Sequence, residues 1–261
     1  MTYPLPSRGY QEIICTAGIS ELGEWIRLYP IDYRYQPREQ QFRKYQWIRV
    51  ELSSKRAGND NRKESRRPVL ESIQIDGPPI GPGNRWQQRR DIVDDLPNHT
   101  LNELKKLHEL DKTSLGIVRP SRIIDLKIEK NEEEWKPEWK ALFDQMRLFG
   151  PPQKPLRKIP YKFSYVFECL DTENQHSAMI EDWELGTLFL KESSRLGSDE
   201  AAAQSVRSKF FEEMCGSGRD TRFFMGTTFP YNSWVVLGVF WPPIATEKSE
   251  TQDPWQLGLE F

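Results

Sequence analysis

The sequence has few cysteines and few histidines, three of each among 261 residues. Cys15, Cys169 and Cys215 are an odd and sparse set, which argues against a disulfide framework and is typical of a reducing compartment. Three histidines provide little material for histidine-based catalysis. The chain also shows no Gly-rich phosphate loop, no Ser-His-Asp order and no Cys-His pairing within a supporting motif. The sequence therefore does not indicate an enzyme of the classes that these motifs identify.

Long hydrophobic runs are absent too. The longest, WVVLGVFW at residues 234–241, has the length of a strand and falls well short of the about 20 residues that a membrane helix needs. The N-terminal stretch MTYPLPSRGYQE lacks the basic start and apolar core of a signal peptide. We therefore expect a cytoplasmic protein without a membrane partner. A composition that is 37% hydrophobic, with nine Trp and thirteen Phe, is sufficient for a folded core.

The charge is nearly balanced overall, with a net value of −2, but it is unevenly distributed. Residues 1–90 contain 16 Lys and Arg against 10 Asp and Glu, whereas residues 91–261 contain 21 against 29. Such asymmetry between the halves of a chain suggests a polyanionic partner for the basic half.

The first part of the chain, residues 1–146, reads mostly as strands with helical insertions. Two β-rich runs at 11–19 and 24–31 flank SELG, a short hairpin-like connection, and apolar and polar residues alternate at 45–53, 67–76 and 121–130. Two helices are expected at 84–95 and 99–110. This pattern predicts a small bent sheet or barrel, which by its architecture resembles PUA-like or OB-like folds.

A second unit is expected at residues 159–243. A helix begins near residue 137, and the Pro-rich stretch GPPQKPLRKIP at 150–160 marks the predicted domain boundary. Beyond it, strands and helices follow in the order β-β-α-α-β-β. The whole chain is thus predicted to be α+β, with a flexible polar tail at 244–261.

The tail ends in the hexapeptide QLGLEF, which carries large apolar residues. An extended peptide binds through a few such anchors and an orienting polar group, here Leu259, Phe261 and the amide of Gln256. The hexapeptide resembles the motif Gln-Leu-x-Leu-x-Phe with which many bacterial DNA polymerases and repair proteins bind the β sliding clamp. Gln256, Leu257, Leu259 and Phe261 match it, and the resemblance implies the sliding clamp as a partner. The alternative is that residues 254–261 pack on their own domain.

Basic and aromatic residues alternate through residues 34–49, and a basic loop follows. Cations neutralise phosphates and aromatic rings stack on unpaired bases, so this region is predicted to bind DNA or RNA. The predicted contacts are Arg34, Arg38, Arg43, Lys44, Lys55, Arg56, Arg62, Lys63, Arg66 and Arg67. The alternative is a solvated loop beside ordinary core aromatics, in a protein that acts purely as an adaptor.

Two groups of residues offer candidate chemistry. Asp125, Lys127 and Glu129 lie on one face of a predicted strand, and Asp/Glu-x-Lys resembles the metal-binding element of restriction-type nucleases, for which Glu71 or Asp76 would supply a further carboxylate.

His176, Asp182 and Glu184 form the second group, seven residues after Cys169. Zinc needs about four ligands, and only Cys169 and His176 are close in sequence, so we predict no metal and no cofactor. The carboxylates are better explained as stabilisers of a helix N-terminus.

Taken together, the sequence predicts a bacterial DNA-associated accessory protein that binds nucleic acid and docks on the sliding clamp, in replication, repair, phage defence or a mobile element. The alternative is a metal-dependent nuclease or nucleotide-modifying enzyme.

Overall fold

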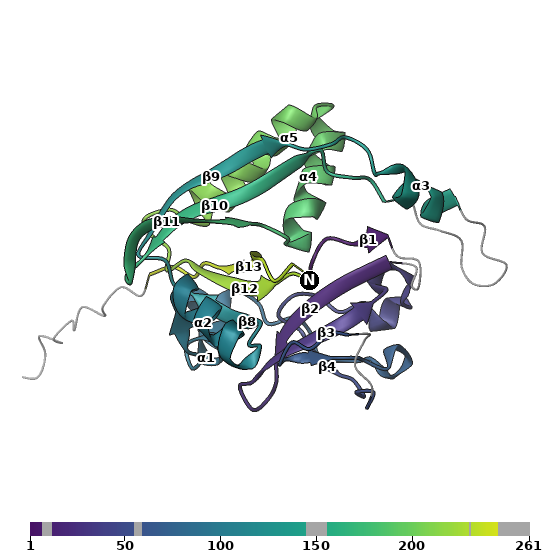
Figure 1. The fold of residues 1–261 in the computed structure, drawn as a ribbon, viewed down its shortest axis with the longest axis horizontal. Helices are drawn as coiled ribbons and strands as arrows, with labels where there is room; N and C mark the ends of the chain where they lie inside the picture. Colours follow the sequence, from purple (N-terminus) through teal and green to yellow (C-terminus); the bar gives the residue numbers. More distant parts are fainter. Residues whose placement is uncertain (7–11, 55–58, 145–155, 230, 245–261) are drawn as a thin grey trace, which may run out of the picture.

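The computed structural model describes residues 1–6, 12–54, 59–144, 156–229 and 231–244. These residues form an α+β fold with four small sheets and no closed barrel, so the predicted fold class is confirmed (Figure 1). For the first part of the chain the sequence left open a small bent sheet or a barrel, and the structure shows small open sheets. No helix in the described ranges is long and apolar enough to cross a membrane.

The N-terminal unit, residues 1–95, is built around the hairpin expected from the β-rich runs on either side of SELG. Its elements are β1 (Leu5–Pro6), β2 (Glu12–Ile19), β3 (Trp25–Ile31), η1 (Tyr33–Tyr35), η2 (Arg38–Gln40), β4 (Trp47–Arg49), β5 (Ser65–Arg66), η3 (Leu70–Ser72), β6 (Gln74–Asp76) and α1 (Gly83–Val93). One sheet has the order β1-β2-β3-β5, and β4 pairs with β6 in a separate ribbon. Both ribbon strands are shorter than the predicted runs. Before β6 the chain turns through η3, where the Ser72 hydroxyl donates to the Val69 carbonyl at 2.7 Å.

The C-terminal unit, residues 97–244, contains two sheets that share one core. Its elements are β7 (Asn98–His99), α2 (Leu101–Asp111), β8 (Leu115–Val118), β9 (Arg122–Lys130), α3 (Pro137–Asp144), β10 (Tyr161–Cys169), β11 (Thr172–Met179), α4 (Trp183–Leu196), α5 (Asp199–Arg207), the π-helical turn η4 (Ser208–Glu213), β12 (Arg222–Thr227) and β13 (Trp234–Phe240). The sheets have the orders β9-β10-β11 and β7-β8-β12-β13. From β10 onward the order is the predicted β-β-α-α-β-β.

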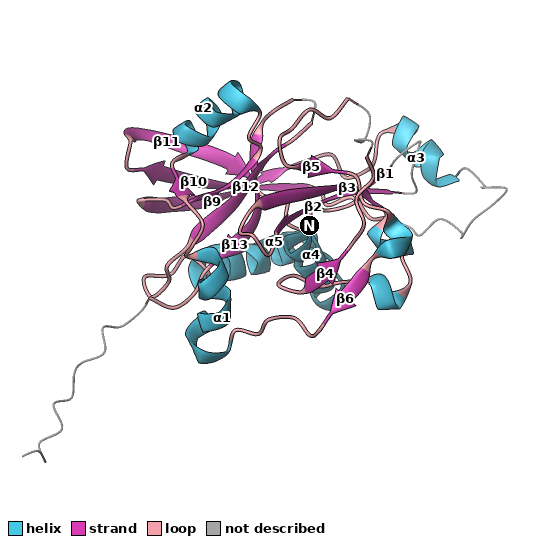
Figure 2. Cartoon of the chain, turned by 90° about the horizontal axis from the view of Figure 1, so that it is seen from below, coloured by secondary structure: helices cyan, strands magenta, loops and turns pink. Residues whose placement is uncertain are grey.

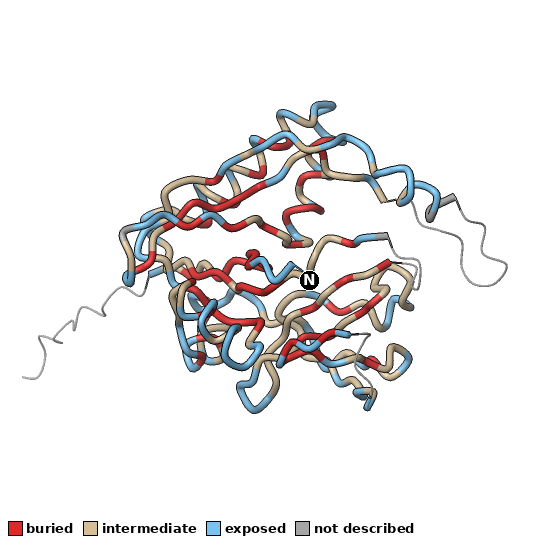
Figure 3. The backbone as a smooth tube through the Cα atoms, viewed as in Figure 1, coloured by how far each residue is buried: buried red, intermediate tan, exposed pale blue. Residues whose placement is uncertain are grey.

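The core of the C-terminal unit lies between its two sheets and beneath α4 and α5. Tyr165 of β10 stacks on Phe223 of β12 with ring centroids 4.5 Å apart, and Phe189 of α4 and Phe210 of η4 are fully buried in the same cluster. Figure 3 shows the buried residues running along the inner strands. Strands β9 and β10 pair along their length, from Arg122 opposite Glu168 to Lys130 opposite Tyr161. The chain on either side of the Pro-rich stretch therefore belongs to one sheet.

Main-chain hydrogen bonds join the two units through the first residues of the chain. The Thr2 amide donates to the Cys15 carbonyl at 3.0 Å, and the Tyr3 amide donates to the Glu181 carbonyl at 3.3 Å. The Glu181 amide in turn donates to the Val236 carbonyl of β13 at 2.8 Å. Burial at this seam raises the pKa of the Glu181 carboxyl to about 7.

A buried arginine also crosses between the units. Arg27 of β3 is 1% exposed, and its guanidinium donates to the carbonyl of Ser114, just before β8, at 2.7 Å and to the Ser114 hydroxyl at 3.2 Å. The Glu64 carboxylate accepts from the same hydroxyl at 2.7 Å and from the Ser114 amide. A Cβ at Gly226 of β12 would lie 3.1 Å from the guanidinium, so glycine leaves the room that Arg27 occupies.

A second buried cation, Arg62, lies in the basic loop. It is 3% exposed and forms two hydrogen bonds to the Asp60 carboxylate, at 2.8 and 2.6 Å. It also donates to the Thr227 carbonyl of β12 at 2.9 Å. Arg62, which the sequence predicted to contact nucleic acid, has its guanidinium enclosed by Asp60 and the C-terminal unit instead.

We expect Arg62→Ala to lower the free energy of unfolding by about 3–5 kcal/mol, because it leaves the Asp60 carboxylate buried without its cation. Urea denaturation followed by circular dichroism measures this change. Arg38→Ala, at an exposed position of η2, is the matched control and should change stability by less than about 0.5 kcal/mol. Equal stabilities for the two variants would contradict the structural role of Arg62.

Candidate nucleic-acid interface

The predicted nucleic-acid residues differ in their surroundings. Among those that the structure describes, Arg34, Lys44, Arg62 and Lys63 each pair with a carboxylate. Arg38, Arg43 and Arg66 are exposed, and Arg67 is half-buried. Lys55 and Arg56 lie outside the described residues. Half of the described residues of the basic stretch are therefore neutralised within the fold, so a candidate surface is one that also carries partly exposed aromatic rings.

A cleft of about 2230 Å³ lies between the N-terminal unit and the C-terminal unit. Residues of β4, β6, α1 and α4, which are labelled in Figure 2, line it. Half-buried aromatic side chains make up much of the wall: Trp25, Tyr33, Tyr45, Trp47, Trp183 and Trp241. Cations line it from both units: Arg43, Lys44, Arg49, Arg89, Lys191, Lys209 and Arg219. Carboxylates line it too, among them Asp182 and Glu184, so the cleft has both signs of charge.

Aromatic rings continue from one unit to the other along this wall. Tyr45 lies edge-on to Trp86 of α1, with centroids 6.2 Å apart, and Trp86 lies edge-on to Trp241 at 5.2 Å. The Arg89 guanidinium covers both Tyr45 and Trp86, at 3.9 and 4.5 Å from the ring centroids. Lys209 and Arg219 lie 4.9 and 4.7 Å from the Trp241 ring. Such contacts between cations and rings are favourable and hold both groups in place.

The backbone is strained at the same place. Tyr45 has φ 60°, and Asn84, Arg85 and Trp86 have φ values of 45°, 53° and 69° at the start of α1. These are four of the six non-glycine residues with positive φ in the part of the chain that the structure describes. Side chains with a Cβ rarely adopt this conformation, and residues that do so cluster at functional sites. The strain therefore favours the wall around Tyr45 as a site.

The Tyr45 hydroxyl is buried and has no hydrogen-bond partner among the described residues. Burial raises the pKa of this phenol above its usual value, so the hydroxyl remains a hydrogen-bond donor across the physiological pH range.

Lys44 forms an ion pair across the cleft. Its ammonium lies 3.3 Å from Asp182 and 2.7 Å from Glu184, at the N-terminus of α4. Burial alone would lower the pKa of Lys44, but Asp182, Tyr45 and Glu184 outweigh it and raise this pKa above its usual value. Asp182 also caps α4 by accepting from the Glu184 amide at 2.9 Å, as the sequence predicts for these acids. Lys44 is therefore a fixed cation rather than a proton acceptor.

Among the described residues, the acids considered for a nuclease site do not gather into a metal-binding group. Asp125 of β9 pairs with Arg207 at 2.8 Å, while Lys127 and Glu129 are exposed on the same strand. Asp76 pairs with Arg49 in the β4–β6 ribbon, and Glu71 is exposed in η3. Within the described ranges, none of these acids belongs to a group of three metal-capable side chains.

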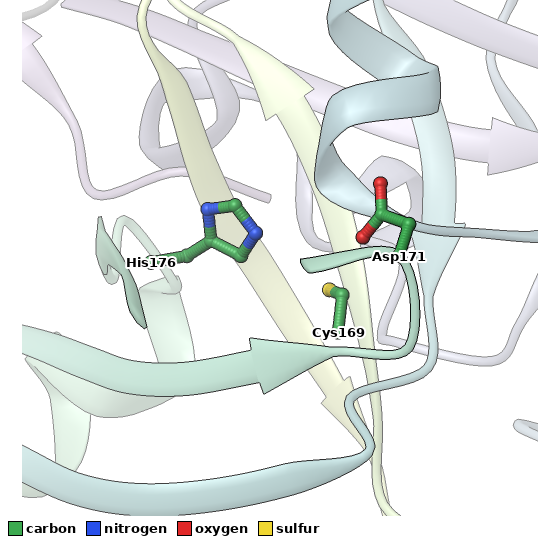
Figure 4. A group of neighbouring side chains, drawn as sticks. All are labelled: Cys169, Asp171 and His176. Carbon is green, nitrogen blue, oxygen red and sulfur yellow. The ribbon is translucent and has the colours of Figure 1, made fainter. Parts of the chain in front are cut away.

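The second chemical group, His176, Asp182 and Glu184, is divided between two places. Asp182 and Glu184 bind Lys44 in the cleft, whereas His176 lies in the β10–β11 hairpin with Cys169 and Asp171 (Figure 4). Asp171 is a residue that sequence reasoning missed. The signal was the short spacing Cys-x-Asp-x4-His, because a hairpin turn within that spacing brings its ends together.

Family models match nearly the whole chain. One, described as a domain of unknown function (DUF8757), matches residues 97–256, which is more than half of the sequence. The chain belongs to this family. A second model, described as a domain of unknown function (DUF8758), matches residues 1–95. The border between the two coincides with the change from the N-terminal to the C-terminal unit. No curated protein and no solved structure matches the chain.

A double-mutant cycle tests the ion pair in the cleft. We expect Lys44→Met to cost about 1–3 kcal/mol of stability, because the Asp182 carboxylate, 2% exposed, loses its cation. Asp182→Asn keeps a residue that can cap α4 but removes the charge. The two changes together should cost less than their sum by at least about 0.5 kcal/mol, as measured by urea denaturation. Additive effects would show that the pair does not couple the units.

Proposed function

We propose that this protein binds single-stranded nucleic acid in the cleft between its two units. The observation that carries the proposal is the aromatic wall, on which the half-buried Tyr45 and Trp241 come from different units, join through the buried Trp86 and have cations against their rings. Proteins that bind single strands combine aromatic platforms for the bases with cations that follow the backbone.

The charge of the cleft indicates which part of a nucleic acid it would recognise. Carboxylates and cations both line it, so attraction for phosphate is weaker than on a uniformly basic surface. Half-buried rings such as Trp47 and Trp183 present apolar faces that suit unstacked bases. Bases in a duplex are stacked on each other, so we expect unpaired strands to bind in preference to double helices.

We further propose that the C-terminal hexapeptide docks on the bacterial β sliding clamp. Gln256, Leu257, Leu259 and Phe261 lie outside the described residues, and the support comes from their resemblance to the clamp-binding motif. The last described residue is Ile244, and the segment from there to Gln256 would span at most about 40 Å if extended. The body could then hold a strand while the tail holds the ring that encircles the DNA. The protein would act as a cytoplasmic accessory factor in replication, repair, phage defence or a mobile element.

Fluorescence anisotropy with a labelled oligonucleotide tests the cleft. The wild-type protein should bind a mixed-sequence single strand more tightly than the same sequence as a duplex. Trp47→Ala should weaken binding by about 5–150-fold, which corresponds to 1–3 kcal/mol for one stacked base. Tyr231→Ala, at a residue that is 82% exposed and outside the cleft lining, is the aromatic control and should bind like the wild type. A Trp47→Ala protein that binds as well as the control would refute the cleft as the interface.

A peptide covering residues 250–261 tests the tail. It should bind a bacterial sliding clamp with micromolar affinity, about −8 kcal/mol, because an extended peptide needs no parent fold. Leu259→Ala and Phe261→Ala should each cost about 1–3 kcal/mol of binding. Glu260→Ala changes a position that the motif leaves free and should bind normally.

The same substitutions in the full chain distinguish the alternative, in which the tail packs on its own domain. If the residues are anchors for a partner, the melting temperature stays unchanged. A lower melting temperature together with no clamp binding would establish self-packing instead.

A further inference from the structure

Three side chains that bind metals in proteins meet at the end of the β10–β11 hairpin. Cys169 is the last residue of β10, Asp171 lies in the turn and His176 lies in β11, opposite Phe167. A ligand atom from each lies within 4.8 Å of the others. Figure 4 shows the thiol, the carboxylate and the imidazole facing one another. Cys169 is 2% exposed and His176 is 9% exposed, so two of the three groups are withdrawn from solvent.

The imidazole of His176 carries an unused nitrogen. Its Nε2 atom is buried and has no hydrogen-bond partner among the described residues. In Figure 4 the ring nitrogen farther from the main chain points toward Cys169 and Asp171. Buried polar atoms are almost always paired, so one that is unpaired and aimed at two other ligands calls for an explanation. A metal ion between the three residues would supply the missing partner.

Neighbouring groups hold the other two ligands in place. The Thr100 hydroxyl donates to the Asp171 carboxylate at 2.8 Å, while it caps α2 by accepting from the Glu103 amide. The Leu101 amide at the start of α2 donates a hydrogen bond to the Cys169 thiol. Hydrogen bonds of this kind orient ligands around metal ions.

We propose that Cys169, Asp171 and His176 bind one divalent transition-metal ion, with zinc as the preferred metal. Thiolate, imidazole and carboxylate together are typical zinc ligands, whereas calcium and magnesium take oxygen ligands. Bonds of about 2.0–2.3 Å place tetrahedral ligand atoms about 3.5 Å apart, so the group closes slightly on binding. Asp171 is exposed and can make that adjustment. The sequence prediction of no metal rested on finding two nearby ligands, and the hairpin supplies the third.

Three protein ligands leave one coordination position for water or another small ligand, as in zinc sites that are not purely structural. A hollow of about 550 Å³ lies beside the cluster, lined by Ser121, Glu168, Cys169, Leu170, Asp171 and Thr172. Solvent can therefore reach the cluster from the side of the exposed Asp171 carboxylate. The site lies in the C-terminal unit and shares no lining residue with the aromatic cleft, so it does not depend on the proposed nucleic-acid function.

The test is metal binding by the full chain, kept reduced and stripped of metal with a chelator. Titration calorimetry with Zn²⁺ should give one site per chain, and Zn²⁺ should raise the melting temperature. Co²⁺ in place of zinc should give a thiolate-to-cobalt charge-transfer band and the intense visible bands of tetrahedral cobalt. Asp171→Asn changes an exposed residue and should weaken zinc binding by more than about tenfold. Cys169→Ala should abolish the charge-transfer band.

Two variants serve as matched controls. Cys215→Ala removes a thiol near Phe210, and His108→Gln removes an imidazole that bonds to the Thr113 carbonyl; both should bind zinc like the wild type. Absence of a one-to-one zinc complex, or equal zinc affinity in Asp171→Asn and the controls, would overturn the proposal. So would a cobalt spectrum without the thiolate band.

Discussion

The arrangement of this protein depends on the buried guanidinium of Arg27. It extends from β3 of the N-terminal unit to Ser114 of the C-terminal unit, where Glu64 accepts from the same serine. A buried charge is tolerated only when nearby groups satisfy it, so this contact permits little variation in how the units meet. The seam formed by Thr2, Tyr3 and Glu181 adds main-chain hydrogen bonds to the same junction.

Because the junction between the two units is fixed, the walls of the cleft are already in place before a ligand binds. Tyr45 comes from the N-terminal unit and Trp241 from the C-terminal unit, and the Trp86 ring contacts the rings of both. Lys44 is held by Asp182 and is not free to follow a ligand. A preorganised surface loses less conformational entropy when it binds, which suits a site that relies on stacking. The strained backbone at Tyr45 is maintained by the same rigidity.

The sequence predicted the secondary structure better than it predicted the tertiary contacts. Alternation identified the β2–β3 hairpin, and the order β-β-α-α-β-β was correct because local periodicity determines it. Local periodicity does not show which charged side chains are buried. Arg62 has the same sequence surroundings as its basic neighbours, but it is buried against Asp60, two residues earlier. The cleft was not predictable, because Trp86 and Trp241 are distant in sequence and meet only through tertiary packing. The Cys169, Asp171 and His176 cluster required knowledge of where the hairpin turned.

Glu181 makes the seam between the units sensitive to protons. An ordinary glutamate has a pKa of 4.5, whereas burial raises that of Glu181 to about 7. Between these values the unfolded chain has lost this proton and the folded chain retains it, so folding takes up a proton. This residue therefore lowers stability progressively as the pH rises from 4.5 to about 7, and above that range its unfavourable contribution is constant. A slightly acidic medium therefore favours the folded chain through a residue that lies at the junction of the two units.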